Sequence, residues 1–247
     1  MLNVRQSRIL QLIGTNSSSA VKDLSAALGV SSVTIRQDLN LLEQEGFLKR
    51  THGGAVLKGA EDIFTRMGIN YEKKLRIAQK AAALIHDGET ILIESGSANA
   101  LLARELLKKD VTIITTNVYI ARQFRNSAKA RIILMGGQYQ HESESLVGKI
   151  TKLCIDQVNY DKAFIGIDGY TAKTGFTLRD LFRAEISNHI IKKSKDVYIV
   201  SDSGKFGRAE LTGICAVCDI HHIVTDRDLE TRYINEFTKA GIDLILA

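Results

Sequence analysis

The stretch GVSSVTIRQDLNLLEQEGFLKRTHGGAV, residues 29–56, constrains the fold of this chain more than any other part of the sequence. It contains Ser31, a residue type that caps helices, in front of the run VTIRQDLNLLEQE. Ile35, Leu39 and Leu42 recur in that run at i, i+4 and i+7, so one of its faces is apolar. We therefore predict an amphipathic helix with one side packed against a core.

The solvent side of this predicted helix carries groups that can read base edges. At about 100° per residue, Val33, Arg36, Gln37 and Asn40 fall opposite the apolar face. A guanidinium fork and two amides are groups that pair bidentately with guanine or adenine in a major groove. The predicted DNA-contacting residues of the helix are Ser31, Ser32, Val33, Thr34, Arg36, Gln37 and Asn40.

A basic hairpin is expected after the helix. Gly46 can end the helix, because glycine readily adopts the left-handed conformation of a helix C-terminus. Two short apolar segments then flank a Gly-Gly turn, which is the pattern of a β-hairpin. Basic residues near its tip suit phosphates or a minor groove. The predicted contacts of the hairpin are Lys49, Arg50, Thr51 and His52.

Two further helical patterns precede this stretch, over residues 4–13 and 19–28, and Gly29-Val30-Ser31 is a tight turn between the last two helices. Three helices and a hairpin make a small winged helix-turn-helix domain, which we place at residues 1–57. A small helical subdomain with a solvated charged face would explain any single helix pair. The complete ordered pattern favours DNA binding instead.

The charge distribution also suits a nucleic-acid partner. The net charge is +5, and residues 1–60 hold seven Lys and Arg against four Asp and Glu, so they supply +3 of it. No apolar run approaches the roughly 20 residues of a membrane span, and MLNVRQSRIL lacks the apolar core of a signal peptide. We expect a cytoplasmic protein without a membrane partner.

Residues 5–57 resemble the N-terminal DNA-binding domain of the DeoR family of bacterial transcription regulators. The matching residues are Arg5, Ile9, Leu24, Val30, Ser31, Thr34, Ile35, Arg36, Gln37, Asp38, Leu39, Leu42, Gly46, Leu48, Arg50, His52, Gly53, Gly54 and Ala55. Many members carry a second Arg where this chain has Gln37, which bears on the operator sequence. The resemblance implies a transcription regulator, and we expect a repressor. A homo-oligomer, dimer or tetramer, would bind paired half-sites in a double-stranded DNA operator.

The rest of the chain alternates between strand and helix patterns, after a predicted linker at residues 58–70. The strand candidates are short, β-branched and almost continuously apolar, as strands buried on both faces are. They are residues 90–93, 111–115, 131–135, 163–167, 197–200, 222–224 and 244–246. The helix candidates are residues 71–85, 98–108, 118–126, 146–157, 180–194 and 231–240. This alternation predicts a mostly parallel α/β domain over residues 71–247.

Polar residues cluster where the predicted strands end, which is where open α/β sheets bind ligands. The first strand ends in ESGSAN, residues 94–99, and leads into a helix, whose free N–H groups can form an anion site. Lys205 adds a positive charge near this loop. Gly, Ser and Asp are also ordinary turn residues, so each motif by itself says little. The later strands end in Thr116-Asn117, Gly136-Gly137, Asp168-Gly169 and residues 202–206.

Residues 74–225 resemble the effector domain of the same family, whose fold is similar to ribose-5-phosphate isomerase and coenzyme A transferase. The resemblance implies a sensor of phosphorylated sugars or related metabolites. Residues 96–99 would hold the phosphate, and Asp168, Glu185 and Lys205 would meet the sugar hydroxyls and the phosphate. The implied effector-binding residues are Gly96, Ser97, Ala98, Asn99, Thr116, Asn117, Gly136, Gly137, Asp168, Gly169, Glu185 and Lys205.

This loop departs from the family pattern. Many members carry Asp-Ser-Gly-Thr-Thr where this chain has Glu94 to Ala98, and Asn99 replaces a further hydroxyl residue. An atypical ligand or a differently shaped pocket would follow from these changes.

An active aldose–ketose sugar-phosphate isomerase with an appended DNA-binding domain is the main alternative. It would need a carboxylate base and a group that polarises a carbonyl, which Asp168, Glu185 and Lys205 could supply. The isomerases carry a Lys-led glycine-rich loop ahead of the base, whereas Phe176 and Leu178 replace small residues here. We therefore expect a sensor and no enzyme.

A redox or metal sensor built on Cys215 and Cys218 is a third possibility. The pair forms a single CAVC motif, and a working site needs further ligands or a helix N-terminus beside it. The third cysteine, Cys154, is distant in sequence, and three cysteines are too few for a disulfide framework. We expect packed, reduced thiols, and neither a metal nor a cofactor.

Overall fold

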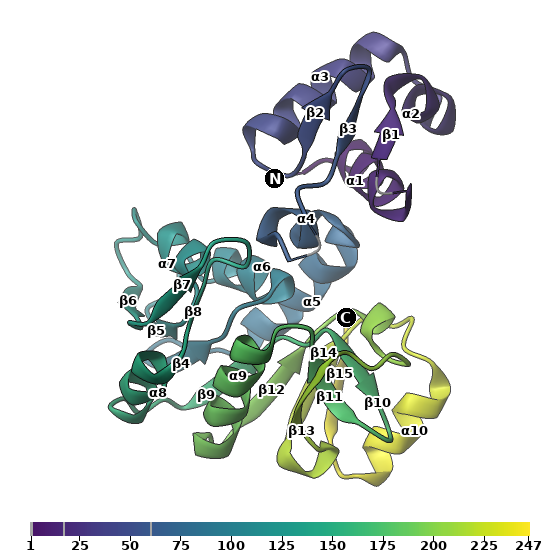
Figure 1. The fold of residues 1–247 in the computed structure, drawn as a ribbon. Helices are drawn as coiled ribbons and strands as arrows, with labels where there is room; N and C mark the ends of the chain where they lie inside the picture. Colours follow the sequence, from purple (N-terminus) through teal and green to yellow (C-terminus); the bar gives the residue numbers. More distant parts are fainter. Residues whose placement is uncertain (1, 17, 60) are drawn as a thin grey trace. The chain divides into compact units, whose positions relative to one another are not determined.

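The computed structural model describes residues 2–16, 18–59 and 61–247, and the chain divides into two compact units (Figure 1). The N-terminal unit is Met1–Glu72 and the C-terminal unit is Lys73–Ala247. Each unit has its own core and sheet. In the described part of the chain, no helix is long and apolar enough to cross a membrane.

Within its described residues, the N-terminal unit combines helices with a three-stranded antiparallel sheet in the order β1-β3-β2. The first elements are α1 (Val4–Asn16), β1 (Ser18–Ala20), α2 (Val21–Leu28) and α3 (Ser32–Gln44). The hairpin strands are β2 (Lys49–Thr51) and β3 (Gly54–Val56). The predicted helices and hairpin are confirmed, except that residues 19 and 20, predicted as helix, belong to β1.

The sheet tolerates β1 because Gly54 has no side chain. A Cβ at Gly54 would lie 2.3 Å from the carbonyl oxygen of Ser19, far inside normal contact distance. The two strands pair closely, and the Val21 N–H donates to the Gly53 carbonyl at 2.8 Å. The pairing of β1 with β3 depends on backbone atoms and a glycine. No periodic pattern of apolar residues therefore marks it in the sequence.

The apolar face of α3 is buried as the sequence predicted. Ile35, Leu39 and Leu42 are at most 1% exposed. They belong to a core that α1, α2 and the hairpin complete, with buried side chains at Ile9, Leu10, Ile13, Val21, Leu24, Phe47, Leu48 and Ala55. Helix α3 therefore has a fixed inner face and presents its other face to solvent.

A charged contact also ties α1 to α3. The guanidinium of Arg5 donates from Nε to Asp38 Oδ2 at 2.5 Å and from Nη2 to Oδ1 at 3.3 Å. The Gln6 amide donates to the same Oδ1 at 3.3 Å. Asp38 is only 3% exposed, so its charge depends on these partners. The contact fixes the rotation of α3 about its own axis.

Part of the predicted linker at residues 58–70 is folded. Helix α4 (Ile63–Gly68) is capped by Asp62, whose side chain accepts the Thr65 N–H at 2.8 Å. It packs against α1, where a Cβ at Gly68 would lie 2.4 Å from Leu10 Cδ1. The division between the units falls in the first turn of α5 (Tyr71–Ala83).

The C-terminal unit, all of which the structure describes, is built on a seven-stranded, fully parallel sheet. The strands in spatial order are β15 (Asp243–Leu246), β14 (His222–Thr225), β12 (Val197–Val200), β9 (Lys162–Ile165), β4 (Thr90–Ile93), β5 (Thr112–Thr115) and β6 (Arg131–Leu134). Each lies within two residues of a predicted strand, so the predicted parallel α/β domain is confirmed. The expected burial on both faces was wrong for the two edge strands. Strand β6 is largely exposed, and β15 has no fully buried residue.

Helices alternate with these strands along the chain (Figure 1). They are α5, α6 (Ser97–Glu105), α7 (Val118–Gln123), α8 (Lys149–Asp156), α9 (Leu181–Lys193) and α10 (Thr231–Lys239). The sequence predicted all of them, but it started α8 too early. Residues 145–147 form a strand, and Gly148 at φ 91° then begins the helix.

Two small antiparallel sheets were not predicted. One joins β10 (Gly169–Thr171), β11 (Gly175–Leu178) and β13 (Thr212–Cys215), and the other joins β7 (Gln138–Gln140) and β8 (Ser145–Val147). Behind the first sheet, Tyr170 packs among aromatic rings with centroids 4.6–5.9 Å from its own. These rings belong to Phe176, Phe206, Tyr233 and Phe237.

Replacing Gly54 with alanine tests the β1–β3 contact. We expect Gly54→Ala to destabilise the N-terminal unit by about 2–4 kcal/mol, because the new methyl group must displace the Ser19 backbone. Hydrogen exchange of the Val21 amide measures the effect. Gly59→Ala is the control, since nothing lies within 4 Å of a Cβ there. Equal protection in both variants would contradict the contact.

Candidate functional site

Helix α3 begins with a side-chain cap. The Ser31 hydroxyl accepts the Thr34 N–H at 3.1 Å and lies 2.9 Å from the Thr34 hydroxyl. Val33 is 62% exposed, and Arg36, Gln37 and Asn40 are also exposed. The predicted base-reading groups therefore lie together on the solvent face of a capped helix, while Ser32 and Thr34 are half-buried at its start.

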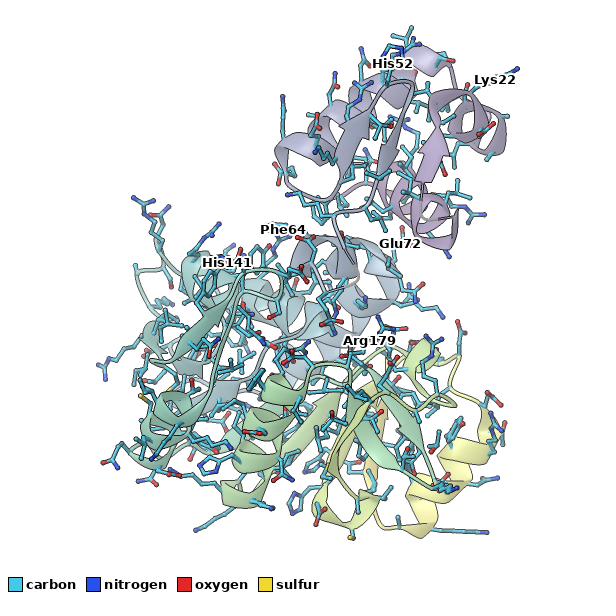
Figure 2. The ribbon with its side chains drawn as sticks, in the orientation of Figure 1. Lys22, His52, Phe64, Glu72, His141 and Arg179 are labelled. Carbon is cyan, nitrogen blue, oxygen red and sulfur yellow. The ribbon has the colours of Figure 1, made fainter. Side chains whose placement is uncertain are left out.

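The hairpin is fastened to this helix through Arg50. Its backbone N–H donates to Glu43 Oε1 at 2.8 Å, and its guanidinium donates to Asn40 Oδ1. Two predicted DNA contacts, Arg50 and Asn40, are thus bonded to each other. Lys49, Thr51 and His52 are exposed, and Figure 2 shows His52 at the turn between β2 and β3.

A second cluster lies at the carboxyl edge of the parallel sheet, where the strand ends of an open α/β sheet meet. An acidic residue lies within three residues after the end of each of four neighbouring strands, and all four are 1–2% exposed. They are Glu94 after β4, Asp168 after β9, Asp202 after β12 and Asp226 after β14. Buried carboxylates need partners, and each has them.

Asp168 stands between two cations. Arg183 Nη1 lies 3.9 Å from its Oδ2, and Lys205 Nζ lies 3.9 Å from its Oδ1. The Arg179 N–H also donates to Oδ2 at 3.4 Å. The structure therefore brings together Asp168 and Lys205, as the sequence predicted, and adds Arg183, which it did not.

Arg183 links this centre to the first strand end. It is 1% exposed, and its Nε donates to the Ser95 hydroxyl at 3.1 Å. Ser95 in turn donates to Glu94 Oε1 at 3.0 Å. Arg183, Ser187 and Ile190 share one buried helix face, but the apolar residues of α9 do not mark a single face in the sequence. A lone Arg on a buried face is a reason to look for a site.

The N-terminus of α6 opens beside Glu94 and Ser95. Gly96 occupies the N-cap position without a side-chain hydrogen bond, and Ser97, Ala98 and Asn99 are buried. The first N–H groups of a helix have no intrahelical acceptor, so they can bind an anion. The Asn99 amide donates to the carbonyls of Glu94 at 3.1 Å and Phe164 at 3.0 Å, which joins β4 to β9.

Ion pairs continue from the cluster to the start of α5. Lys74 Nζ lies 3.9 Å from Asp202 Oδ2, and Lys73 Nζ lies 3.4 Å from Asp226 Oδ1. Asp226 accepts the N–H of Ser203 at 2.7 Å and its hydroxyl at 2.8 Å. Ser203 begins the short 3-10 helix Ser203–Lys205 that carries Lys205.

The structure does not bring Glu185 to this cluster. Its carboxylate is 46% exposed and binds Lys152 Nζ at 2.8 Å on the neighbouring helix α8. Residues two apart on a helix point about 200° away from each other. Because Arg183 faces the strand ends, Glu185 faces outward.

Several other predicted effector residues hold the fold together. Asn117 accepts the Ile120 N–H at 3.0 Å as the cap of α7 and donates to the Ser143 carbonyl at 2.8 Å, while its neighbour Thr116 is buried. Gly137 has φ 149°, and a Cβ there would lie 1.9 Å from Thr151 Oγ1. A Cβ at Gly169 would lie 2.6 Å from the Arg208 carbonyl oxygen.

Gly136 has a similar place. Its carbonyl accepts the Thr151 hydroxyl at 2.8 Å, so both glycines of this pair pack against α8. Turn glycines at strand ends thus serve close packing here, which a sequence pattern cannot separate from ligand binding.

The cysteine pair lines a separate open cavity of about 640 Å³ between the β10–β11 turn, β13 and α10. None of the predicted effector residues lines this cavity. Burial raises the pKa of the Cys215 thiol, which is the opposite of what activates a cysteine. Among the described residues, no group of three or more His, Cys, Asp or Glu side chains could hold a metal ion.

The chain matches two known domains. They are the DeoR-like helix-turn-helix domain over residues 5–60 and the DeoR C terminal sensor domain over residues 69–227. The chain is 31% identical over 248 residues to the HTH-type transcriptional regulator GolR of Listeria innocua, with 98% of each chain covered. It is 27% identical over 243 residues to the lactose phosphotransferase system repressor of Lactococcus lactis, with 95% of each covered. This chain therefore belongs to the DeoR family.

Family membership confirms a DNA-binding transcription regulator with a sensor domain. Among solved structures, ribose 5-phosphate isomerase A from Methanocaldococcus jannaschii aligns with a TM-score of 0.42 at 19% identity. That alignment covers 56% of this chain and 55% of the isomerase.

Asp226 gives the cluster a defined response to acid. Burial would raise the pKa of Asp226, but hydrogen bonds from Ser203 and the charge of Lys73 outweigh burial and lower it. A lowered pKa stabilises the fold above the ordinary Asp value and loses that contribution as the pH falls through the lowered pKa. Acid should therefore loosen this edge of the sheet.

We expect Asp226→Asn to reduce the stability of the C-terminal unit at pH 7 by about 1–3 kcal/mol, because Ser203 loses its charged acceptor and Lys73 keeps only Asp228 as an acidic partner. The difference from wild type should shrink as the pH falls towards 3. Thermal unfolding across this range measures it. Asp110→Asn is the control, because that side chain is exposed at another place in the same unit. A difference that stays constant with pH would contradict the assignment.

Proposed function

We propose that this regulator represses transcription by binding operator DNA with α3 and the β2–β3 hairpin, and that a phosphorylated sugar weakens this binding. DNA binding is assigned to residues 1–57 and effector binding and oligomerisation to residues 71–247, with residues 58–70 joining them. The observation that carries the proposal is the exposed row of Val33, Arg36 and Gln37 on a capped helix of a DNA-binding domain. The protein acts as a homo-oligomer in the cytoplasm.

On the DNA, Arg36, Gln37 and Asn40 read base edges, and Val33 offers an apolar contact to a thymine methyl. Arg50 acts with Asn40 as one unit, because the two side chains are bonded. Lys49 and His52 contact phosphates or the minor groove beside the recognition helix. Ser31, Ser32, Thr34 and Thr51 supply hydroxyl groups for the phosphate backbone. The repressor role is supported by the relative from Lactococcus lactis, which is named a repressor.

In the effector domain, the N–H groups of Ser97 and Ala98 hold the phosphate, with Gly96 leaving room for it. Lys205 and Arg183 supply the positive charge. Asp168 accepts hydrogen bonds from sugar hydroxyls. Glu185, Asn117 and Gly137 are not assigned to the ligand, because their contacts are with other parts of the protein.

Effector binding changes the ion pairs at the strand ends. Asp168 neutralises Lys205 and Arg183 in the free protein, so an arriving phosphate competes with Asp168 for both cations. Movement of Lys205 moves the 3-10 helix that Asp226 and Asp202 hold, and these carboxylates also bind Lys73 and Lys74 of α5. The division between the two units falls in helix α5. DNA and the phosphorylated sugar therefore favour different states of the ion pairs that Lys73 and Lys74 make.

Recognition by α3 is tested on an operator selected from random DNA. Arg36→Ala should lose about 1–3 kcal/mol on the best sequence and discriminate less between bases. Lys49→Ala should weaken binding to all sequences and reduce the salt slope by about one. Arg8→Ala, an exposed Arg on α1, is the control. If Arg36→Ala binds like wild type, another element reads the DNA.

The response to the effector is tested in operator titrations with phosphorylated sugars. Lys205→Ala should keep operator affinity and lose the response. Lys74→Gln should still bind the sugar by calorimetry but transmit about tenfold less of its effect to the DNA. Lys162→Gln is the control, because it breaks a 2.7 Å pair with Glu89 at the opposite edge of the sheet. A Lys74→Gln protein that responds fully would rule out coupling through α5.

A further inference from the structure

Helix α8 (Lys149–Asp156) has apolar residues on both sides. Its inner side buries Thr151 and Ile155 against the core of the C-terminal unit. On its outer side, Ile150 is 62% exposed and Leu153 is 54% exposed. The outer face of a surface helix is normally polar, so two large aliphatic side chains one turn apart call for a partner.

The apolar surface continues onto the edge of the sheet. Ile133 of β6 lies beside Ile114 of β5, which belongs to the same core cluster as Ile155 of α8. Ile133 is nevertheless 37% exposed. The end of β6 touches α8, since a Cβ at Gly136 would lie 3.6 Å from Ile150 Cγ2.

We call this surface the α8 patch and define it by Ile133, Ile150 and Leu153. Figure 1 shows β6, β7 and α8 at one end of the sheet. Strand β6 is also the last strand there, so its outer backbone groups have no neighbouring strand. Exposed edges of this kind are usually covered or paired.

The charges around the patch match a second copy of the same helix. Lys149 at the start of α8 and Asp156 at its end are both exposed and flank Ile150 and Leu153. If two copies of α8 lie antiparallel about a two-fold axis, Lys149 of each copy meets Asp156 of the other. The same arrangement places Ile150 against Leu153 of the partner. The eight-residue helix is about 12 Å long, so both charge pairs form across one short contact.

We infer that the α8 patch is the interface through which two copies of this chain form a symmetric dimer. A two-fold contact uses the same surface of both copies, which is what a self-complementary helix provides. The inference rests on the proposed function only in that paired half-sites require paired chains. It assigns the contact to α8 and the β6 edge and to no other surface.

The molecular mass of the full chain in sedimentation equilibrium tests this inference. Wild type should be a dimer, or a tetramer made of two such dimers, at micromolar concentration. The double variant Ile150→Glu, Leu153→Glu should raise the dissociation constant of the dimer at least about 100-fold, because two desolvated anchors per chain are lost. Leu211→Glu is the matched control, since Leu211 is 83% exposed outside the patch. A monomeric wild type, or a double variant as associated as wild type, would overturn the inference.

Charge reversal separates the interface from effects on folding. Lys149→Asp and Asp156→Lys should each weaken the dimer about tenfold or more, and the double reversal should restore it. Asp156 also binds His189 of its own chain at 2.7 Å. The double reversal does not restore that contact, so any recovery of dimer affinity would come from the partner chain. A double reversal no better than either single change would contradict the antiparallel arrangement.

Operator binding shows which of the two proposals fails if one does. The Ile150→Glu, Leu153→Glu monomer should still bind an isolated half-site in a manner that depends on Arg36, but should lose the gain from a second half-site. If wild type is a dimer and the double variant a monomer, but neither protein binds DNA, the interface stands and the proposed function fails. If both proteins bind DNA normally and have the same mass, only the interface fails.

Discussion

The paired charges around Asp168 are the constraint on which the sensor half of this protein depends. A carboxylate that is 1% exposed is costly to ionise unless cations and hydrogen-bond donors surround it. Arg183, Lys205 and the Arg179 N–H meet that need, and in doing so they hold α9, the 3-10 helix and the end of β9 at one point. The same cations are the groups that an anionic ligand would seek. Stability of the free state and affinity for the ligand therefore compete for one set of contacts.

The DNA-binding half uses charge in a similar way but for a different purpose. Asp38 is buried between Arg5 and Gln6, and this contact orients α3 so that its polar face points to solvent. Arg50 is held by Glu43 and Asn40, which sets the hairpin against the helix before DNA arrives. Preorganised side chains lose less freedom on binding. Residues 29–56, which predicted the recognition helix and the hairpin, thus also contain the contacts of Arg50 that hold these two elements together.

The sequence predicted the main elements because their patterns are strong. All seven strands of the parallel sheet are nearly continuous apolar runs, and the apolar face of α3 follows the helical period closely. The small antiparallel sheets escaped because strands such as β10 and β13 have three or four residues and little alternation. Strand β1 escaped because it depends on the missing side chain of Gly54.

The candidate site could be located from sequence but not resolved residue by residue. Polar strand ends pointed to the carboxyl edge of the sheet, and Asp168 and Lys205 do meet there. The prediction named Glu185 and missed Arg183, because the apolar residues of α9 do not fix which of its faces is buried. Asn117 and Gly137 look the same in sequence whether they hold a ligand, cap a helix or admit a neighbouring chain.

The most direct test is the affinity of the wild-type protein for its selected operator during titration with phosphorylated sugars, each paired with its unphosphorylated form. We expect one phosphorylated sugar to lower operator affinity about tenfold or more and the matching free sugar to have no effect. An operator complex that is indifferent to the whole panel, or that responds equally to a free sugar, would contradict the assignment of the α6 N-terminus, Arg183 and Lys205 to a phosphate.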